Sequence, residues 1–174
     1  MALEYLTCSR VTEILGGPVA VGILEPLKVG QFIEDTDFIK VRGLPIIKHK
    51  NYEKSGRHYP ILNPSDYSKR VEIPLPRRGT LAPFTRAIMD YLELIPKSDD
   101  TPVFTFTRQR GHQVVKGVSG MFNHYFRDMG LKNWYRIFEY DPFKLKIFSG
   151  HTRWSSLEKY MNDLTIQDFE KALA

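Results

Sequence analysis

The hydrophobic pattern changes near residue 80, and this change constrains the fold of the 174-residue chain more than any other feature. Before it, residues 37–48 (DFIKVRGLPIIK) and 70–75 (RVEIPL) predict two strands of a small antiparallel sheet. The polar segment between them carries the turn signals Ser55-Gly56 and Asn63-Pro64, which predict a long hairpin loop. Beyond residue 80 the apolar residues recur at helical spacing. We therefore expect an α+β fold that is mainly helical, with its small antiparallel sheet near the N-terminal end.

Helix signals flank the predicted sheet on both sides. Residues 3–15 carry an apolar stripe that ends at residues 16–18 (GGP), which predicts one N-terminal helix. After the sheet, Thr80 is the expected N-cap of a helix that runs to about Ile95. The basic residues 108–117 are expected to form a loop, followed by a helix that begins near residue 119, passes Arg127 and meets a possible break at Gly130.

Two further signals place helices near the C-terminal end. Asp141 is an N-cap followed by a proline at the first helical position, so we expect a short helix over residues 143–148 that ends at Gly150. Ser155 and Glu158 have the spacing of a capping box, which predicts a helix that starts there and carries Tyr160.

Composition and motifs exclude several classes of protein. The formal net charge of +5 permits a polyanionic partner without requiring one. The chain has a single cysteine, no apolar run long enough to cross a bilayer and no signal peptide, so we expect a cytoplasmic location and no membrane partner. It has no Walker loop, dinucleotide fingerprint, His-Glu-x-x-His motif, nucleophile-elbow serine or zinc-type Cys/His array. We therefore expect no cofactor and no metal.

Five residues could carry a reaction built from cationic, imidazole and hydroxyl groups: Arg10, His124, Arg127, His151 and Tyr160. His124 and Arg127 are three apart, so they share one face of a helix. Guanidinium groups can bind the non-bridging oxygens of a phosphodiester and stabilise its transition state. Imidazoles can move protons near neutral pH. A phenol attacks only where a cationic pocket favours phenolate. This set therefore suits attack on a phosphodiester.

Three segments in order along the chain resemble the motifs of one family. Residues 7–15 (TCSRVTEIL) resemble the first arginine box of the tyrosine recombinase, or phage integrase, family. Residues 124–127 (HYFR) are similar to its His-x-x-Arg box. Residues 149–161 (SGHTRWSSLEKYM) resemble the segment that leads from Gly-His to its nucleophilic tyrosine. The resemblance covers essentially the whole chain and is strongest to integrases of archaeal viruses and plasmids.

The resemblance implies a site-specific DNA recombinase that integrates or excises DNA without metal or ATP. Tyr160 would attack the scissile phosphate, form a covalent 3′-phosphotyrosyl bond and release a 5′-hydroxyl. Arg10 and Arg127 would clamp the phosphate, and His151 would hydrogen-bond to it. His124 would assist proton transfer.

Two more roles follow from the resemblance. The family's hairpin lysine, a general acid, corresponds to Lys48, with Lys50 as the alternative. Glu13 matches the acidic residue that supports the first arginine.

The resemblance also implies partners and a domain organisation. Residues 1–174 would form an integrase catalytic domain, truncated at its N-terminus and lacking the core-binding domain. The expected partners are double-stranded DNA and other integrase protomers, which assemble as a tetramer on DNA inside the cell, or the host cell for a viral protein.

Less specific interpretations remain beside this one. Tyr160 could be a rim residue of an amphipathic helix, and His124 could belong to an aromatic cluster. Arg10 could form a structural pair with Glu13, three residues away. At the level of function, the chain could be a non-cleaving DNA-binding remnant of an integrase, or a type IB topoisomerase-like enzyme that relaxes DNA.

Overall fold

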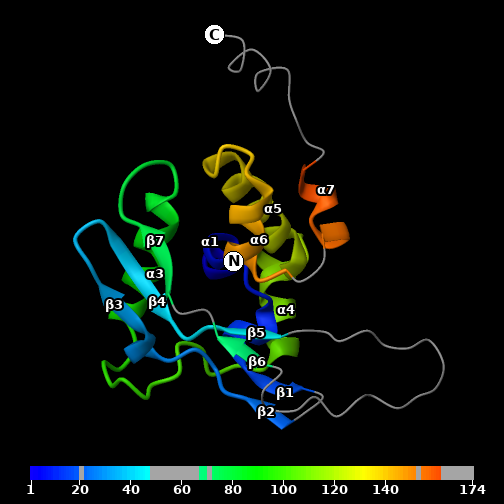
Figure 1. Cartoon of the computed structure of the whole chain (residues 1–174). Coiled ribbons are helices and arrows are strands. Elements are labelled where there is room, and N and C mark those ends of the chain that lie inside the picture. The colour runs from blue at the N-terminus through cyan, green and yellow to red at the C-terminus, as the bar shows by residue number, and fades with distance from the viewer. Residues whose placement is uncertain (20–21, 48–66, 70–71, 152–153, 162–174) are drawn as a thin grey trace, which may run out of the picture.

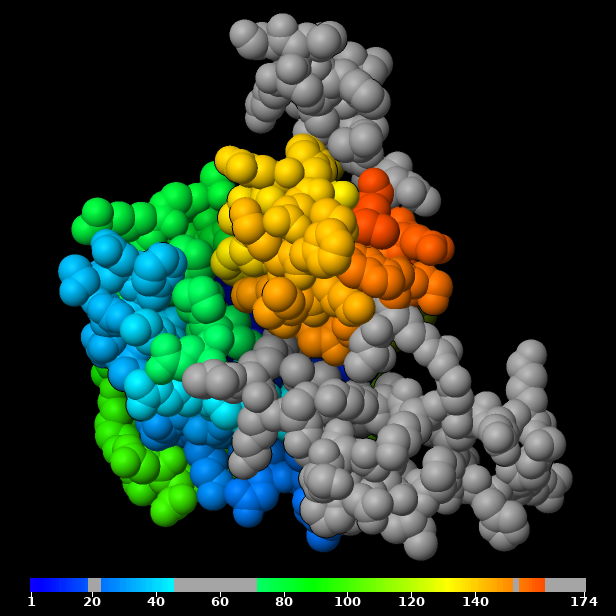
Figure 2. Space-filling view, viewed as in Figure 1, coloured from blue at the N-terminus to red at the C-terminus, as the bar shows by residue number. Residues whose placement is uncertain are grey.

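The chain folds into a mainly helical α+β structure with small antiparallel sheets in its N-terminal half (Figure 1). The computed structural model describes residues 1–19, 22–47, 67–69, 72–151 and 154–161. Among these residues, none of the helices combines the length and apolar character needed to cross a bilayer. In the space-filling view, the α5–α7 region (yellow to orange-red) lies against the sheet region (blue to green) (Figure 2).

The described strands form three antiparallel sheets: β1 (Gly17–Val19) with β2 (Gly22–Leu24); β3 (Phe32–Glu34), β4 (Phe38–Arg42) and β7 (Glu72–Pro76); and β5 (Pro45–Ile47) with β6 (Tyr67–Lys69). In the second sheet Ile39 pairs with Leu75 and Val41 with Ile73. All four side chains are buried, because alternate residues of a strand face the same side. The sheet thus contributes one apolar face to the core.

The single strand expected over residues 37–48 is wrong in detail. It is divided into β4 and β5 at Gly43, whose φ of +67° is accessible to glycine at little cost. Leu44 next to it is fully buried. The pairing of β4 with β7 and of β5 with β6 keeps the predicted antiparallel hairpin, now in two parts.

The N-terminal stripe forms two helices rather than the one expected. α1 (Ala2–Thr7) ends at Cys8, which has a left-handed φ of 51°, and α2 (Val11–Leu15) begins after Arg10. Arg10 is therefore the N-cap of α2 and does not lie inside a helix. The apolar stripe continues across the break, which is why the sequence did not reveal it.

Two helix boundaries in the middle of the chain also differ from expectation. α3 (Ala82–Glu93) has Leu81, not Thr80, as its N-cap, and the Leu81 side chain is buried. Residues 108–117, expected to form a loop, belong to α4 (Arg108–Ser119). The Thr107 hydroxyl accepts a hydrogen bond from the Arg110 amide, and Gly120 closes the helix with φ +71°.

α5 (Asn123–Ile137) packs closely on α1 and passes Gly130 without a break. A Cβ at Gly130 would clash with the Tyr5 carbonyl oxygen, so only glycine permits this approach. The indole nitrogen of Trp134, one turn further on, donates to the Leu6 carbonyl at 2.8 Å. One face of α5 thus fixes the C-terminal end of α1, where the site lies.

The C-terminal helices agree more closely with the sequence signals. The Asp141 carboxylate accepts from the first amides of α6 (Pro142–Ser149), and Gly150 ends this helix with φ +70°. Both features are confirmed. A short 3-10 turn, η3 (Trp154–Ser156), then precedes α7 (Glu158–Met161). The predicted helix therefore begins three residues after Ser155, and Tyr160 lies within it.

Candidate active site

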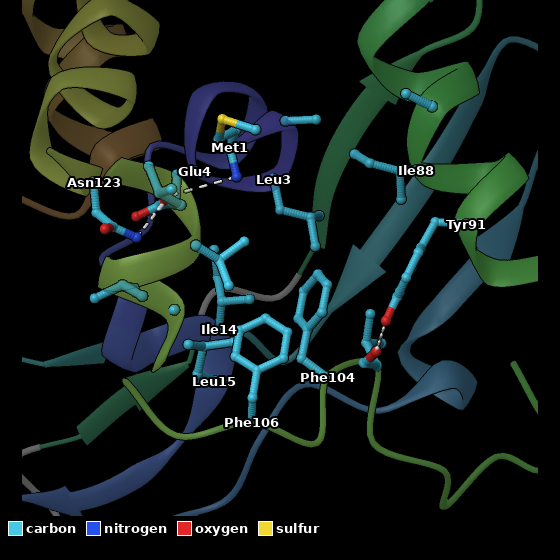
Figure 3. A pocket seen from close by; sticks show the side chains of 17 residues that line it. Met1, Leu3, Glu4, Ile14, Leu15, Ile88, Tyr91, Phe104, Phe106 and Asn123 are labelled. Carbon is cyan, nitrogen blue, oxygen red and sulfur yellow. Dashed lines mark hydrogen bonds and ion pairs between the residues drawn. The ribbon is translucent and has the colours of Figure 1, made fainter. Parts of the chain in front are cut away.

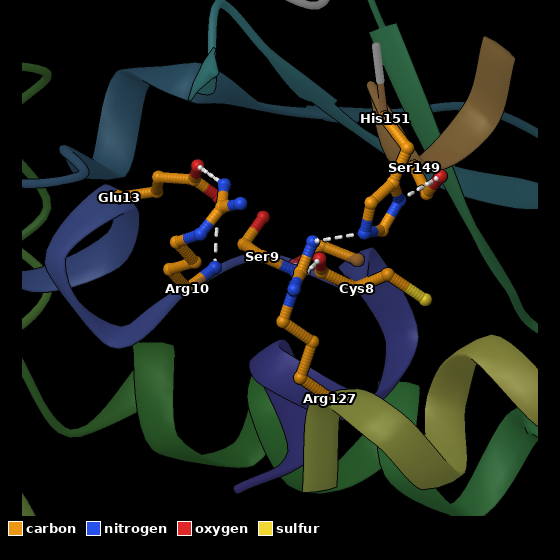
Figure 4. Close-up of polar contacts among 8 residues, drawn as sticks. Cys8, Ser9, Arg10, Glu13, Arg127, Ser149 and His151 are labelled. Carbon is orange, nitrogen blue, oxygen red and sulfur yellow. Dashed lines mark hydrogen bonds and ion pairs between the residues drawn. The ribbon is translucent and has the colours of Figure 1, made fainter. Parts of the chain in front are cut away.

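The loop between α1 and α2, the middle of α5 and the segment after α6 meet in one polar cluster (Figure 4). We define this polar cluster as Arg10, Glu13, Arg127, His151 and Tyr160. In Figure 4 the Arg127 side chain points toward His151, and the Arg10 guanidinium lies against the Glu13 carboxylate. The cluster therefore joins the predicted residues of all three motifs.

Arg127 is the buried centre of the polar cluster, with 4% of its surface exposed. Its Nε donates to the Cys8 carbonyl at 2.8 Å, and its Nη2 lies 3.3 Å from His151 Nε2. The Cys8 carbonyl ends α1, where no helical partner is available, so the guanidinium has a structural task as well. Burial, followed by the positive charge of Arg10, lowers the pKa of Arg127. The guanidinium remains charged at any physiological pH.

The contacts of His151 determine its tautomer. A guanidinium can only donate, so Nε2 must accept from Arg127, and the ring proton lies on Nδ1. Nδ1 lies 2.7 Å from the Ser149 hydroxyl oxygen and donates to it. Ser149 can then donate to the Lys146 carbonyl at 3.5 Å. His151 is thus neutral here, and its Nε2 is oriented toward Arg127.

Arg10 and Glu13 form a two-point contact. The Arg10 guanidinium binds Glu13 Oε1 at 2.8 Å, and the Arg10 backbone amide donates to Glu13 Oε2 at 2.8 Å. Glu13 is 1% exposed, whereas the Arg10 side chain is 24% exposed. The structural pair and the expected supporting role of Glu13 therefore describe one geometry, in which a buried carboxylate orients a partly exposed guanidinium.

Tyr160 is held from α7 against α5. Its hydroxyl donates to Asp128 Oδ1 at 2.5 Å, and its ring centroid lies 6.2 Å from that of His151. Only 3% of the residue is exposed. Burial, and next the hydrogen bond to Asp128, raise the pKa of the phenol. Both effects oppose ionisation, so the phenol is neutral in this arrangement.

His124 lies at the rim of the polar cluster. It is on the exposed side of α5, while Arg127 on the same helix is buried. Desolvation by neighbouring atoms, and then the charge of Arg127, lower the pKa of the imidazole. The charge of Asp128 raises this pKa, and the charges of Arg10 and Lys159 lower it further. His124 is thus mainly neutral at pH 7.

The predicted lysine cannot be placed, because Lys48 and Lys50 lie outside the described residues, directly after β5. The structure adds three groups that the sequence did not suggest: the Cys8 carbonyl, Ser149 and Asp128. The first and last are found only through contacts between distant segments, and no local pattern indicates them. Among the described residues, no three His, Cys, Asp or Glu side chains are grouped so that they could hold a metal ion.

An apolar cavity of about 340 Å³ lies apart from the polar cluster, between α1, α2, α3 and α4 (Figure 3). Aliphatic and aromatic side chains such as Ile88 and Phe104 dominate its lining. At one end Asn123 donates to the Glu4 carboxylate at 3.3 Å, and the N-terminal ammonium lies 3.6 Å from the same carboxylate. None of the five predicted catalytic residues that the structure describes lines this cavity.

The polar cluster combines a buried guanidinium, a partly exposed one, a neutral imidazole and a neutral phenol. Such a set can bind an anion and hold a hydroxyl next to it. No protein-family model matches the sequence, and neither a curated protein nor a solved structure is significantly similar to it.

Proposed function

We propose that this chain is the catalytic domain of a tyrosine-type DNA recombinase or integrase, and that its α+β structure is the catalytic fold of that family. The observation that carries the proposal is the convergence at the polar cluster. Arg127 contacts His151, and the His151 ring lies beside Tyr160. The positive charge of Arg10 contributes to the lowered pKa of Arg127. These residues come from the three sequence motifs, and an unrelated fold would have no reason to bring them together.

In the proposed reaction, a DNA phosphate binds between the guanidinium groups of Arg10 and Arg127. Two donors of Arg127 are committed to Cys8 and His151. A guanidinium has five donors, so, counting contacts within the described residues, further ones remain for phosphate oxygens. His151 could donate to the phosphate once its Nε2 is protonated or the ring turns away from Arg127. Tyr160 then attacks phosphorus and becomes joined to the DNA 3′ end.

One observation favours a second candidate, a DNA-binding remnant that does not cleave. Tyr160 is 3% exposed, and its hydroxyl is bonded to a carboxylate rather than directed at an open anion site. A phosphate could reach the phenolic oxygen only after the side chains that cover it move aside. A remnant would have no need for that movement.

The test uses nicked duplexes of randomised sequence, in which the short strand released by cleavage diffuses away and traps the adduct. Wild-type protein is expected to give a protein–DNA adduct that survives denaturation. Tyr160→Phe should give none, because the ring still packs but the nucleophile is gone. As a matched control, Tyr91→Phe removes a hydroxyl bonded only to the Val103 carbonyl in the described part of the chain, and should leave the adduct unchanged.

Three other outcomes separate the alternatives. DNA binding without adduct would support the remnant. Relaxation of a supercoiled plasmid without a specific site would support the topoisomerase. An adduct that persists in Tyr160→Phe would show that another residue is the nucleophile.

A further inference from the structure

Asp128, the residue after Arg127, contacts the reacting atom of the proposed site. Its Oδ1 accepts the Tyr160 hydroxyl at 2.5 Å, which is at the short end for a hydrogen bond between a hydroxyl and a carboxylate. Its Oδ2 binds the Lys159 ammonium at 3.1 Å. The carboxylate thus has one oxygen on the phenol and the other on a cation.

We propose that Asp128 is the general base of strand cleavage, the group that takes the proton from the Tyr160 hydroxyl. This inference rests on the proposed function and adds to it the destination of the nucleophile's proton. Among the described residues, Asp128 is the hydrogen-bond acceptor of the phenolic oxygen. The other candidate, His151 Nε2, accepts from Arg127 instead.

A base is needed because the phenol is neutral. Burial and the bond to Asp128 raise its pKa, so phenolate is not available before attack. In the resting state the proton stays on the Tyr160 hydroxyl, because a carboxylate is a much weaker base than a phenolate. It becomes acidic only as the oxygen–phosphorus bond withdraws electrons from the phenolic oxygen, so transfer and attack are concerted.

The atoms balance in both directions. In cleavage, the Tyr160 oxygen bonds to phosphorus while its proton moves to Asp128 Oδ1, and the bond from phosphorus to the 5′-oxygen breaks. The 5′-oxygen takes a proton from a general acid, the role expected of Lys48. In rejoining, a 5′-hydroxyl attacks the phosphotyrosine, its proton returns to that acid, and Asp128 gives its proton back to Tyr160. No oxidant or co-reactant is consumed.

Lys159 keeps this arrangement compact. Its ammonium contacts Asp128 and also lies 4.6 Å from the centroid of the Tyr160 ring. The cation therefore offsets the negative charge that the carboxylate would otherwise present to an incoming phosphate. This contact allows an anion to serve as the base beside an anionic substrate.

The test is Asp128→Asn, an isosteric change that keeps an oxygen acceptor but not a base. In single-turnover assays on the nicked duplexes, adduct formation should slow by roughly 100- to 1,000-fold. Replacing Tyr160 by a fluorinated tyrosine with a more acidic phenol should restore about tenfold of this loss, because a more acidic nucleophile needs less help. Asp90→Asn on α3 is the control for the loss of one negative charge and should cleave as the wild type does.

Each other result overturns the proposal in a recognisable way. Cleavage by Asp128→Asn as fast as the wild type, or faster, would make Asp128 a restraint on Tyr160. Slow cleavage without rescue by the fluorinated residue would make it a positioning residue. If the wild type binds DNA but never forms an adduct, the proposed function is wrong, and so is the role of Asp128 as a general base. A direct titration of the Tyr160 phenol is independent of cleavage: its pKa should fall in Asp128→Asn, and an unchanged pKa would refute the contact in solution.

Discussion

The polar cluster and the apolar cavity are both built on the first two helices, yet they use them in opposite ways. The polar cluster lies where the chain breaks between α1 and α2, and it takes the Cys8 carbonyl and the Arg10 side chain from that break. The cavity uses the start of α1 and the apolar face of α2, including Leu3 and Ile14. In the polar cluster, polar groups bind one another across the fold. In the cavity, apolar side chains leave space unfilled.

The polar cluster thus holds the groups that could react, whereas the cavity holds empty space. The cavity has a volume of about 340 Å³, but its polar groups, Glu4 and Asn123, bind each other at one end. The polar cluster presents two guanidinium groups, an imidazole and a phenol, which together can act on a phosphodiester. We therefore expect changes in the polar cluster to act mainly on DNA cleavage and changes in the cavity to act mainly on stability.

The largest effect is expected for Arg127→Lys. Lysine keeps the positive charge but loses the fork that reaches both Cys8 and His151. Adduct formation should fall by roughly 1,000-fold or more, because a transition-state contact and the orientation of His151 are lost together. Unfolding in urea should also show a loss of about 1–3 kcal/mol, because the Cys8 carbonyl remains buried without its donor.

The cavity variant Val115→Ile, described below, is the comparison for Arg127→Lys. If Arg127→Lys cleaved normally while its stability fell, Arg127 would be a structural residue only. The polar cluster would then act on stability rather than on DNA cleavage, and the expected difference between the two regions would be absent.

How far the sequence predicted these regions depends on whether the signal is local. The cap at Asp141 and the end at Gly150 were predicted correctly, because both are set by side chains next to the backbone groups they serve. The break at Cys8 was missed, since the apolar stripe runs through it and the Arg127 contact comes from far along the chain. α4 was missed because its basic residues suggested a loop, although Thr107 and Gly120 are suitable caps.

In the site, too, the contacts between distant segments could not be predicted from the sequence. The motifs suggested which residues would meet, but the bond between Asp128 and Tyr160 depends on how α7 packs on α5. The residue types alone therefore do not show that burial and Asp128 raise the pKa of the Tyr160 phenol. The hairpin lysine stays a prediction.

A smaller effect, on stability alone, is expected for Val115→Ile. Val115 lines the cavity, so the added methylene should fill empty space and raise the free energy of unfolding by about 0.5–1 kcal/mol. Val41→Ile makes the same change in the closely packed sheet, where Val41 is fully buried, and should lower stability by about 1–3 kcal/mol. Urea unfolding measures both, and the adduct assay should show normal cleavage by Val115→Ile. Equal effects of the two variants would mean that the cavity is filled in solution.

The smallest effects are expected in the pH dependence of stability, where the two regions should have opposite signs. Burial raises the pKa of Glu4 in the cavity above its ordinary 4.5, so its contribution is greatest at low pH and is lost as the pH rises through the folded-state value. Desolvation and Arg127 lower the pKa of His124 at the polar cluster below its ordinary 6.5. Its contribution is therefore present above pH 6.5 and is lost as the pH falls through the folded-state value.

Glu4→Gln should stabilise the protein relative to the wild type at neutral pH, by on the order of 1 kcal/mol, and less at pH 4. His124→Gln should gain relative to the wild type only below pH 6.5, and by less, because the side chain is partly exposed. Urea unfolding between pH 4 and 8 measures both differences, and a stabilisation that changes with pH in the same direction for both variants would contradict the separation of the two regions.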